Sequence, residues 1–214
     1  MKLRVGVLQL DVALGDRERN RKNVEKWMAS VSVPSDMPTA VVIPEIWDVG
    51  YALDRAAELA DPEGKGAAEF LGSLAKKYGV WFVGGSVLAS TGSGFANRAQ
   101  VINPRGELVA YYDKVHLIRL MEEEKYFTGG RKECLFSLEG AKAGCVICYD
   151  IRFCEWLRTY ALRGTEVLFV SAEWPSPRAD HWKTLLRARA IENQMYMVAC
   201  NRCGTTGDTH FGGG

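Results

Sequence analysis

The sequence lacks the features that mark membrane, secreted and nucleic-acid-binding proteins. It has no run of about 18 apolar residues, the length that a membrane-spanning helix needs. Its first residues alternate like a strand and lack the apolar core and cleavage site of a signal peptide. The 27 Lys and Arg residues balance 26 Asp and Glu residues, and no basic stripe is interleaved with aromatic residues. We therefore expect a cytoplasmic protein that contacts neither a membrane nor nucleic acid.

Other absences bear on the organisation of the chain. We find no internal repeat, no low-complexity stretch and no linker, and 214 residues with 47% hydrophobic content suffice for one sizeable core. Residues 1–214 are therefore expected to form a single domain. Six cysteines without a secretion signal indicate reduced thiols. Residues 209–214 end in a glycine run without a closing strand or a capped helix, which predicts a fold that is incomplete at its C-terminus.

Apolar periodicity predicts strands that alternate with helices. Strands are expected at residues 3–10, 39–43, 80–87, 142–147, 166–170 and 196–200, and helices at residues 17–31, 66–78, 153–163 and 182–193. A hairpin is expected around Asn103-Pro104-Arg105-Gly106, with strands at 99–102 and 108–112. This alternation indicates an α/β layer architecture, in which ligand sites gather at the carboxyl ends of the strands.

Cys148 stands where an apolar strand ends and a polar, helix-forming segment begins. A sharp strand-to-helix turn presents one side chain above a sheet, as in a nucleophile elbow. A thiol in that position can attack a substrate if a cation lowers its pKa and a base takes its proton. Cys134, Cys145 and Cys154 fit the alternative of small buried hydrophobic residues, and position alone leaves Cys148 open between the two.

Two further strand ends offer the base and the cation. Glu45 follows Pro44 in apolar surroundings, where desolvation would raise the pKa of its carboxyl toward the range of a general base. Lys114 ends the second strand of the hairpin. If it faces Cys148 at ~4 Å, its charge is worth on the order of 4 kcal/mol, enough to ionise a thiol near neutral pH. The alternative for both side chains is an ordinary solvated position.

Other combinations of the same residue types are weaker. Two Cys-x-x-Cys pairs, Cys145/Cys148 and Cys200/Cys203, are too far apart for a zinc ribbon and lack a Gly/Pro knuckle, so no metal site is expected. A redox role for the first pair stays an alternative. A Cys–His dyad would need one of the three histidines, none of which lies in a recognisable cysteine-protease signature: His116, His181 and His210.

Three segments together resemble the nitrilase, or carbon–nitrogen hydrolase, superfamily. They are Pro44-Glu45, Asp113-Lys114-Val115-His116-Leu117 and Cys148-Tyr149-Asp150-Ile151-Arg152-Phe153, and their order and separation match the Glu-Lys-Cys triad of that family. The resemblance covers essentially the whole chain. It implies an αββα sandwich, here C-terminally incomplete, and no metal or organic cofactor. It also implies a homodimer through a helix–helix face that contains residues 158–160 and 182–193.

The resemblance also implies roles for individual residues. Glu45 would be the general base and Cys148 the nucleophile, while Lys114 and the backbone N–H of Tyr149 would stabilise the tetrahedral intermediate. The additional loop glutamate of the family corresponds best to Glu123, although a shift of one residue within Glu122-Glu123-Glu124 stays open.

A finer likeness is to the ω-amidase branch, which includes 2-oxoglutaramate amidase-like proteins. It rests on Pro44-Glu45-Ile46-Trp47 with Gly50-Tyr51, on Leu120-Met121-Glu122-Glu123 and on Ser171-Ala172-Glu173-Trp174-Pro175. It implies that Tyr51 faces the substrate, and Tyr149, Glu173 and Trp174 are expected as further contacts. The implied function is hydrolysis of a non-peptide C–N bond in a small carboxylate-bearing amide, through a Cys acyl-enzyme and with release of ammonia. A nitrilase, an N-carbamoyl amidase and a catalytically silent binding module are the alternatives.

Overall fold

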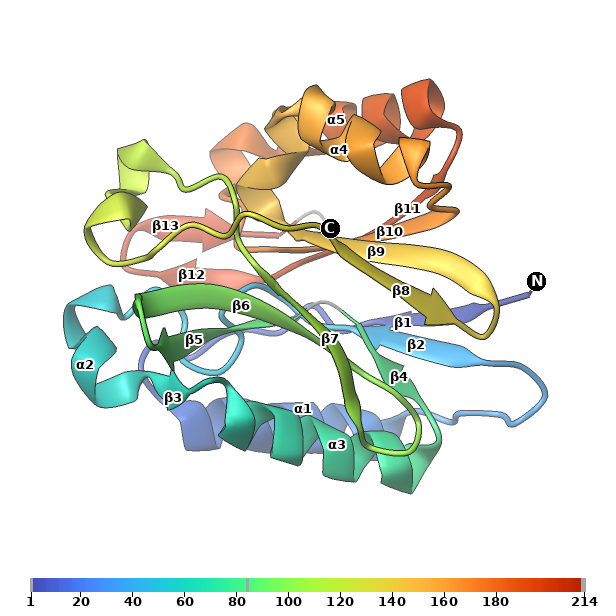
Figure 1. The fold of residues 1–214 in the computed structure, drawn as a ribbon. Helices are drawn as coiled ribbons and strands as arrows, with labels where there is room; N and C mark the ends of the chain where they lie inside the picture. Colours follow the sequence, from blue (N-terminus) through green and yellow to red (C-terminus); the bar gives the residue numbers. More distant parts are fainter. Residues whose placement is uncertain (1, 84, 213–214) are drawn as a thin grey trace.

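The computed structural model describes residues 2–83 and 85–212, which form four layers. Two β-sheets lie face to face, and helices cover the outer face of each sheet (Figure 1). The αββα sandwich expected from the sequence is thus confirmed. Among the described helices, none combines the length and the apolar character that crossing a membrane requires.

The first sheet has the strand order β1-β2-β4-β6-β5-β3, and β7 pairs with β6. Parallel pairing joins β1, β2 and β4, and antiparallel pairing joins β5, β6 and β7. All four residues of β2 are buried, because both faces of this strand are covered. The strands are β1 (Arg4–Val7), β2 (Thr39–Val42), β3 (Asp61–Pro62), β4 (Trp81–Phe82), β5 (Ser86–Thr91), β6 (Gly94–Ile102) and β7 (Leu108–Asp113).

The second sheet has the order β11-β10-β9-β8. Its three parallel strands carry the helical connections, and all six residues of β10 are buried. The strands are β8 (Cys134–Leu138), β9 (Ala141–Ile147), β10 (Val167–Ala172) and β11 (Tyr196–Asn201), followed by a hairpin of β12 (Gly204–Thr206) and β13 (Thr209–Phe211).

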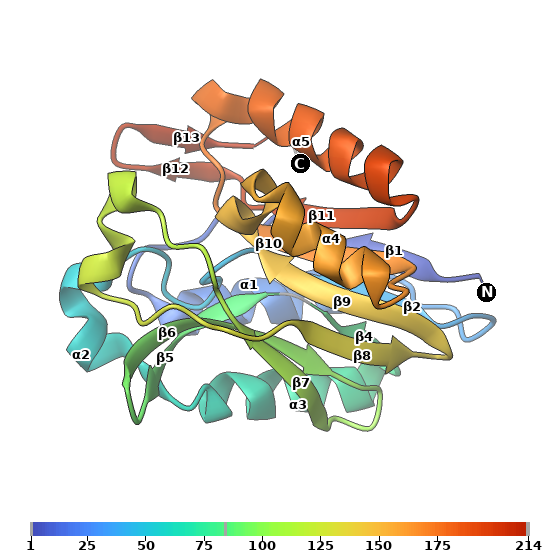
Figure 2. The ribbon, with the colours of Figure 1, turned by 45° about the horizontal axis from the view of Figure 1, so that its top comes forward.

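The helices divide between the two outer layers. Figure 2 shows α4 and α5 over the second sheet, whereas α1 and α3 cover the first sheet. Asp16 caps α1 by accepting the N–H of Arg19, and Gly79 ends α3 with a φ of 65°. The α-helices are α1 (Arg17–Ser30), α2 (Ala56–Leu59), α3 (Lys65–Tyr78), α4 (Cys154–Leu162) and α5 (Ala179–Asn193). Short 3₁₀ helices are η1 (Leu53–Arg55), η2 (Arg119–Met121), η3 (Glu123–Lys125), η4 (Cys148–Arg152) and η5 (Ser176–Arg178).

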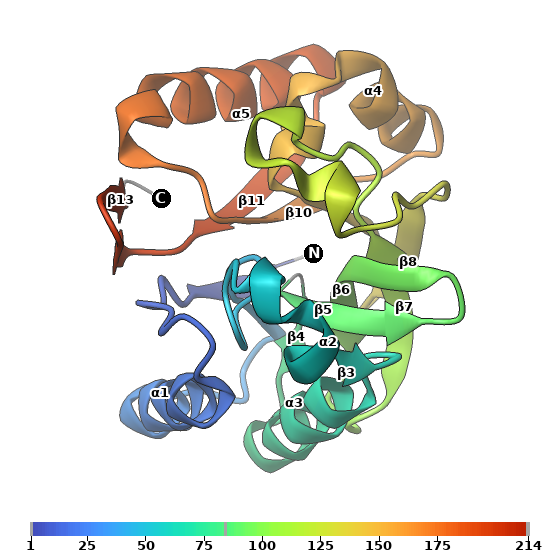
Figure 3. The ribbon, with the colours of Figure 1, turned by 90° about the vertical axis from the view of Figure 1, so that its left-hand side faces the viewer.

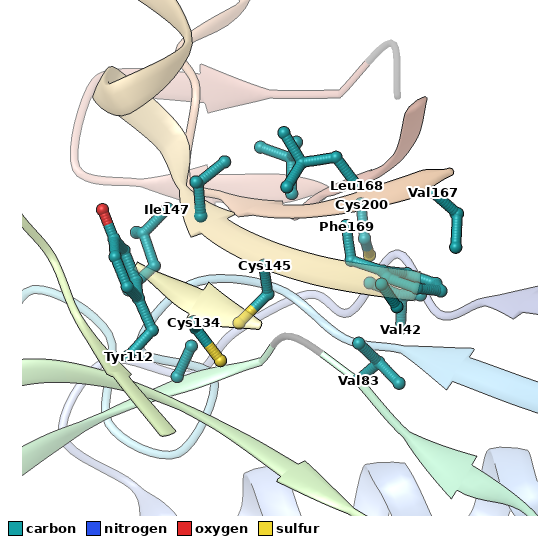
Figure 4. Close-up of a cluster of buried hydrophobic side chains, with 14 of the residues drawn as sticks. Val42, Val83, Tyr112, Cys134, Cys145, Ile147, Val167, Leu168, Phe169 and Cys200 are labelled. Atoms are coloured by element: carbon teal, nitrogen blue, oxygen red, sulfur yellow. The ribbon is translucent and has the colours of Figure 1, made fainter. Parts of the chain in front are cut away.

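The largest apolar core lies between the two sheets (Figure 4). Val42 and Val83 of the first half pack in one cluster with Cys145 and Phe169 of the second sheet. A second cluster fills the space between the first sheet and the helices α1 and α3. Full burial of one such aliphatic or aromatic side chain contributes roughly 1.5–3 kcal/mol, so the sheets are held together mainly by this contact.

A third cluster joins the segment between β7 and β8 to the segment around α2. Phe127 and Leu117 pack there against Leu53 and Ala56. Figure 3 faces this end of the molecule, with α2 and the segment between β7 and β8 in front. The end of the sandwich that carries the strand-terminal polar residues is therefore built from long connections.

Two strand predictions are wrong. The segment expected as one strand at 80–87 forms β4 and β5, which pair with the same edge of β6 at different positions, opposite the edge that pairs with β7. Gly85, with a φ of 60°, turns the chain between them. Residues 209–211, expected to be turn-like, form β13 in register with β12; residues 213 and 214 lie outside the described residues.

The helix–helix face expected for dimer contact stays a prediction, although two of its residues, Tyr160 and Trp182, are buried within the protomer. The Tyr160 hydroxyl donates to the carbonyl of Cys145 and accepts the N–H of Cys134, both at 3.1 Å. Neither aromatic side chain is available to a second copy. Exposed apolar groups of this layer are instead Leu162 on α4 and Ile191 on α5.

Candidate active site

Cys148 occupies the turn between β9 and η4, in a backbone conformation that non-glycine residues rarely adopt. Its φ is 45°, and its side chain is buried. The Asp150 carboxylate stabilises the turn by accepting the N–H of Ile147 at 2.9 Å and that of His116 at 3.0 Å. The geometry is that of the strand-to-helix elbow predicted from the sequence.

Glu45 follows β2 and is fully buried. The next residue, Ile46, has a φ of 39°, and its N–H donates to Ser86 Oγ at 2.9 Å, which fixes the turn. Four donors reach the carboxylate. Its Oε1 accepts Lys114 Nζ at 2.8 Å, Asn97 Nδ2 at 2.8 Å and the Tyr51 hydroxyl at 2.7 Å, and its Oε2 accepts the N–H of Glu173 at 2.9 Å.

Lys114 lies between two buried carboxyl groups. Its Nζ is 2.8 Å from Glu45 Oε1 and 2.8 Å from Glu123 Oε1, and all three side chains are fully buried. Glu123 Oε2 also accepts the N–H of Ile118 at 2.7 Å. Glu122 points elsewhere and pairs with Lys125 at the surface, with 59% of its side chain exposed. The structure therefore places Glu123, rather than its neighbour, beside Lys114.

The electrostatics differ from the sequence-based expectation. Burial raises the pKa of Glu45, but the Lys114 ammonium and the hydrogen bonds from Lys114, Tyr51 and Glu173 lower it further, so the net shift is downward. Burial and the charge of Glu45 raise the pKa of the Cys148 thiol well above its ordinary value, and Lys114 offsets this only in part. The expectation of a raised Glu45 pKa and a thiol ionised by Lys114 is thus wrong. Lys114 lies against two carboxyl groups rather than facing the thiol alone.

A pocket of about 140 Å³ opens in front of Cys148. Three of the four expected substrate contacts line it: Tyr149, Glu173 and Trp174. Tyr51 does not, because its hydroxyl lies between Glu45 and Glu123. The other lining residues are Ile118, Leu120, Met121, Arg152, Pro175 and Arg178.

Two cations give this pocket its charge. The Arg152 guanidinium lies 4.9 Å from the ring of Trp174 and 5.5 Å from that of Tyr149. Among the described residues, no carboxylate lies within salt-bridge distance of Arg152 or Arg178. An anionic ligand group would therefore meet an unpaired guanidinium in this pocket.

Glu173 forms the inner wall of the pocket with a buried arginine. Its Oε2 accepts Arg202 Nη1 at 3.2 Å. Burial, assisted by the nearby charge of Glu45, raises the pKa of Glu173 to about 8 even though Arg202 opposes the shift. Because this carboxyl is paired with the buried Arg202, it adds little net negative charge to the pocket.

The alternative cysteine and histidine sites do not come together. The His116 ring pairs with Asp150, the His181 ring lies 3.5 Å from Arg152, and the His210 ring lies 3.1 Å from Thr205 Oγ1. All six cysteines are free. Within residues 2–83 and 85–212, no group of three or more His, Cys, Asp or Glu side chains is arranged to hold a metal ion.

The family model for carbon–nitrogen hydrolases matches residues 4–214. This chain belongs to the carbon–nitrogen hydrolase family. It is 43% identical over 213 residues to the 2-oxoglutaramate amidase of Bacillus subtilis (strain 168), covering all of this chain and 81% of the relative. It is 32% identical to the ω-amidase YafV of Escherichia coli (strain K12), covering 99% of this chain and 79% of the relative.

A solved structure gives the same fold. The amidase of Nesterenkonia sp. AN1, with acrylamide added at its active-site cysteine, superposes with a TM-score of 0.88 at 25% identity. The match covers 100% of this chain and 84% of that one. The fold class and the family inferred from the sequence are confirmed.

Several residues around the site of this carbon–nitrogen hydrolase were not predicted from the sequence. Asn97, which donates to Glu45, lies in the middle of β6 with no motif around it. Arg202 pairs with Glu173 from beyond β11. Asp150 and His116 connect the elbow to the segment after Lys114, and they were visible only as parts of longer motifs. Their partners come from distant segments, so nothing in the local sequence marks them.

Proposed function

We propose that this carbon–nitrogen hydrolase is an ω-amidase that releases ammonia from a small amide carrying a distal carboxylate. The observation that carries the proposal is the pocket in front of Cys148, which combines a buried thiol with the guanidinium groups of Arg152 and Arg178, neither of which pairs with a carboxylate among the described residues. The amide would lie at Cys148, and the carboxylate would lie at Arg152 or Arg178. The names of the relatives from Bacillus subtilis and Escherichia coli support the same substrate class.

The reaction starts from a neutral thiol, because the pKa of Cys148 is raised. As Sγ bonds to the amide carbon, the thiol proton passes to the Glu45 carboxylate. The carbonyl oxygen becomes an oxyanion that Lys114 stabilises. The N–H of Tyr149 is the second donor, since helix N–H groups in a first turn have no partner within the helix.

Collapse of the intermediate breaks the C–N bond. Glu45 returns the proton to the departing nitrogen, which leaves as ammonia, and a thioester remains on Cys148. Water then attacks the thioester while Glu45 takes one of its protons, and return of that proton to sulfur regenerates the thiol and releases the carboxylic acid. The downward-shifted pKa of Glu45 keeps this carboxyl ionised for both proton abstractions.

The substrate class is tested by a panel of purified substrates and two arginine variants. We expect ammonia release from 2-oxoglutaramate to exceed hydrolysis of a nitrile, of an N-carbamoyl amino acid and of a neutral aliphatic amide. Replacing Arg152 with leucine should raise KM for 2-oxoglutaramate about 10- to 100-fold, because a charge-assisted hydrogen bond is worth about 1.5–3 kcal/mol. The neutral amide should be little affected.

Arg163→Leu is the matched control, because Arg163 is an exposed arginine of the same helical layer, outside the pocket. Equal KM values for the charged and the neutral amide in the unmodified enzyme would rule out carboxylate recognition. Turnover of the nitrile or of the carbamoyl compound in preference to 2-oxoglutaramate would favour the other branches of the superfamily.

We also propose a homodimer through the α4–α5 layer. Leu162 and Ile191 expose 80% and 77% of their surface on this layer, which a second copy could cover. Sedimentation velocity should show a dimer that Ile191→Glu converts to a monomer, while Leu120→Glu, at an exposed leucine outside the layer, leaves the dimer intact. A monomeric unmodified chain would refute this.

A further inference from the structure

The Tyr51 hydroxyl lies between two carboxyl groups, closely enough that the protons can be counted. Its oxygen is 2.7 Å from Glu45 Oε1 and 2.6 Å from Glu123 Oε1. A phenol has one proton, and an ionised carboxylate has none. If both carboxyl groups were ionised, one of these two contacts would hold no proton, and two oxygen lone pairs would face each other at hydrogen-bond distance. In a buried site nothing screens that repulsion.

We propose that a second proton is shared between Glu123 and Tyr51, so that Glu123 is neutral while Glu45 is the ionised base. In the resting site, the Glu123 carboxyl donates to the Tyr51 oxygen, and the Tyr51 hydroxyl donates to Glu45 Oε1. Every short oxygen–oxygen contact then contains one proton. The proposal deepens the proposed function, because it rests on Glu45 as the base.

The hydrogen-bond partners decide which carboxyl group carries the extra proton. Glu45 accepts from Lys114, Asn97, Tyr51 and the N–H of Glu173, a set of donors that stabilises an anion. Glu123 has fewer donors, namely Lys114 and the N–H of Ile118. Its contact with Tyr51 is the one that lacks a proton if both carboxyl groups are ionised. The proton therefore belongs to Glu123. Burial and the two neighbouring carboxyl groups raise the pKa of Tyr51 well above its ordinary value, so its hydroxyl keeps its own proton.

Lys114 cannot supply the missing proton. Its three N–H groups face Glu45, Glu123 and, at 3.4 Å, the Tyr51 oxygen. Each of those protons lies on a line from nitrogen to oxygen rather than between two oxygens. Cys148 is the remaining titratable group that faces the cluster, and its thiol proton is the one that catalysis transfers to Glu45. The neighbouring Glu173 carboxyl is paired with Arg202.

The extra proton balances charge at each stage of the reaction. With Glu123 neutral, the buried cluster contains one ammonium and one carboxylate, whereas two carboxylates would leave a net negative charge without solvent. When the thiol proton reaches Glu45, both carboxyl groups are neutral. The full charge of Lys114 then faces the new oxyanion. With an ionised Glu123, that charge would stay neutralised when it is needed.

Infrared spectroscopy tests the resting proton without any turnover. At pH 7, the difference spectrum between the unmodified protein and Glu123→Gln should contain a lost C=O stretch of a protonated carboxyl group, with a hydrogen–deuterium isotope shift. Glu122→Gln is the matched control, because that exposed, paired carboxylate should contribute only carboxylate bands. The Glu173 carboxyl, with its pKa raised to about 8, is unchanged in both variants and cancels. Loss of carboxylate bands alone in Glu123→Gln would overturn the proposal.

Kinetics of Tyr51→Phe test the role of the shared proton. Without the phenol oxygen, the Glu123 proton loses its acceptor, and Glu123 becomes a second carboxylate that neutralises Lys114. We expect kcat for 2-oxoglutaramate to fall about 100-fold with KM unchanged, as when an oxyanion donor is lost. Tyr196→Phe, at a tyrosine with 79% of its surface exposed, is the control.

A rise in KM with unchanged kcat would make Tyr51 a substrate contact and would overturn this role of the shared proton. Unchanged kcat and KM would do the same. If no amide on the panel is hydrolysed by the unmodified enzyme, the proposed function fails, but the infrared result still decides whether Glu123 holds a proton.

Discussion

Cys148→Ala is expected to lower ammonia release by about 10⁴-fold or more, as loss of a nucleophile does in other covalent hydrolases. Alanine is the matched change because it keeps Cβ and the same strained backbone, with a φ of 45°, and removes only the sulfur. The fold of the variant should stay intact, since the elbow is held by Asp150 rather than by Sγ. Activity is measured as ammonia release, and folding by urea denaturation.

Cys145→Ala and Cys154→Ala are the controls. Cys145 is buried between the sheets, and Cys154 is exposed at the start of α4. Both variants should turn over substrate, and an amide-like electrophile should label Cys148 in each. Because burial and Glu45 raise the pKa of the Cys148 thiol, labelling in the absence of a substrate should accelerate with pH beyond the range of an ordinary thiol. Full turnover in Cys148→Ala would place the nucleophile elsewhere.

The parallel core of the fold is predictable because its strands are short apolar runs bounded by turns. The strands β2, β9, β10 and β11 and the helices α1, α3, α4 and α5 all appear near their expected positions. The strands that were not predicted from the sequence form only because they pair with neighbouring strands. Thus β3 contains only Asp61 and Pro62 and exists because it pairs with β5, and β8 is defined by its pairing with β9. A two-residue strand has no period that a sequence pattern could reveal.

The positions of the proposed triad were predictable for a related reason. Glu45 and Lys114 follow β2 and β7 of the first sheet, Cys148 follows β9 of the second, and these strand ends meet at one end of the sandwich. Glu123 was ambiguous because three consecutive glutamates look alike in sequence. The left-handed backbone of Glu122, with a φ of 55°, turns Glu123 inward. The direction of the pKa shifts was missed because pairwise reasoning gave Lys114 one partner, whereas the fold gives it two carboxyl groups.

Replacing Lys114 with methionine is expected to remove activity and to destabilise the fold. The ammonium is the main oxyanion donor of the proposed mechanism, and loss of such a donor costs about 10²–10³ in kcat. The change also leaves the Glu45 carboxylate buried without a counter-charge. Breaking a buried ion pair from one side costs about 3–5 kcal/mol.

The loss of stability should depend on pH, and its sign follows from Glu45. In the unmodified protein, the pKa of this carboxyl is lowered below 4.5, so its contribution is present above that value and is lost as the pH falls. In Lys114→Met, burial acts without the opposing charge and raises the pKa of Glu45. The variant should therefore lose stability as the pH rises above 4.5 and regain part of it in acid. Urea denaturation at a series of pH values measures this difference.

Lys125→Met provides the matched control, because Lys125 pairs with Glu122 at the surface, where 60% and 59% of the two side chains are exposed. An exposed pair contributes at most about 1 kcal/mol, and its loss should leave turnover unchanged. In the double variant Lys114→Met/Glu45→Gln, the buried carboxylate without a counter-charge is also removed. Much of the stability should therefore return, while the variant stays inactive. Equal stability of Lys114→Met and Lys125→Met would mean that the buried ammonium does not hold the two carboxyl groups together.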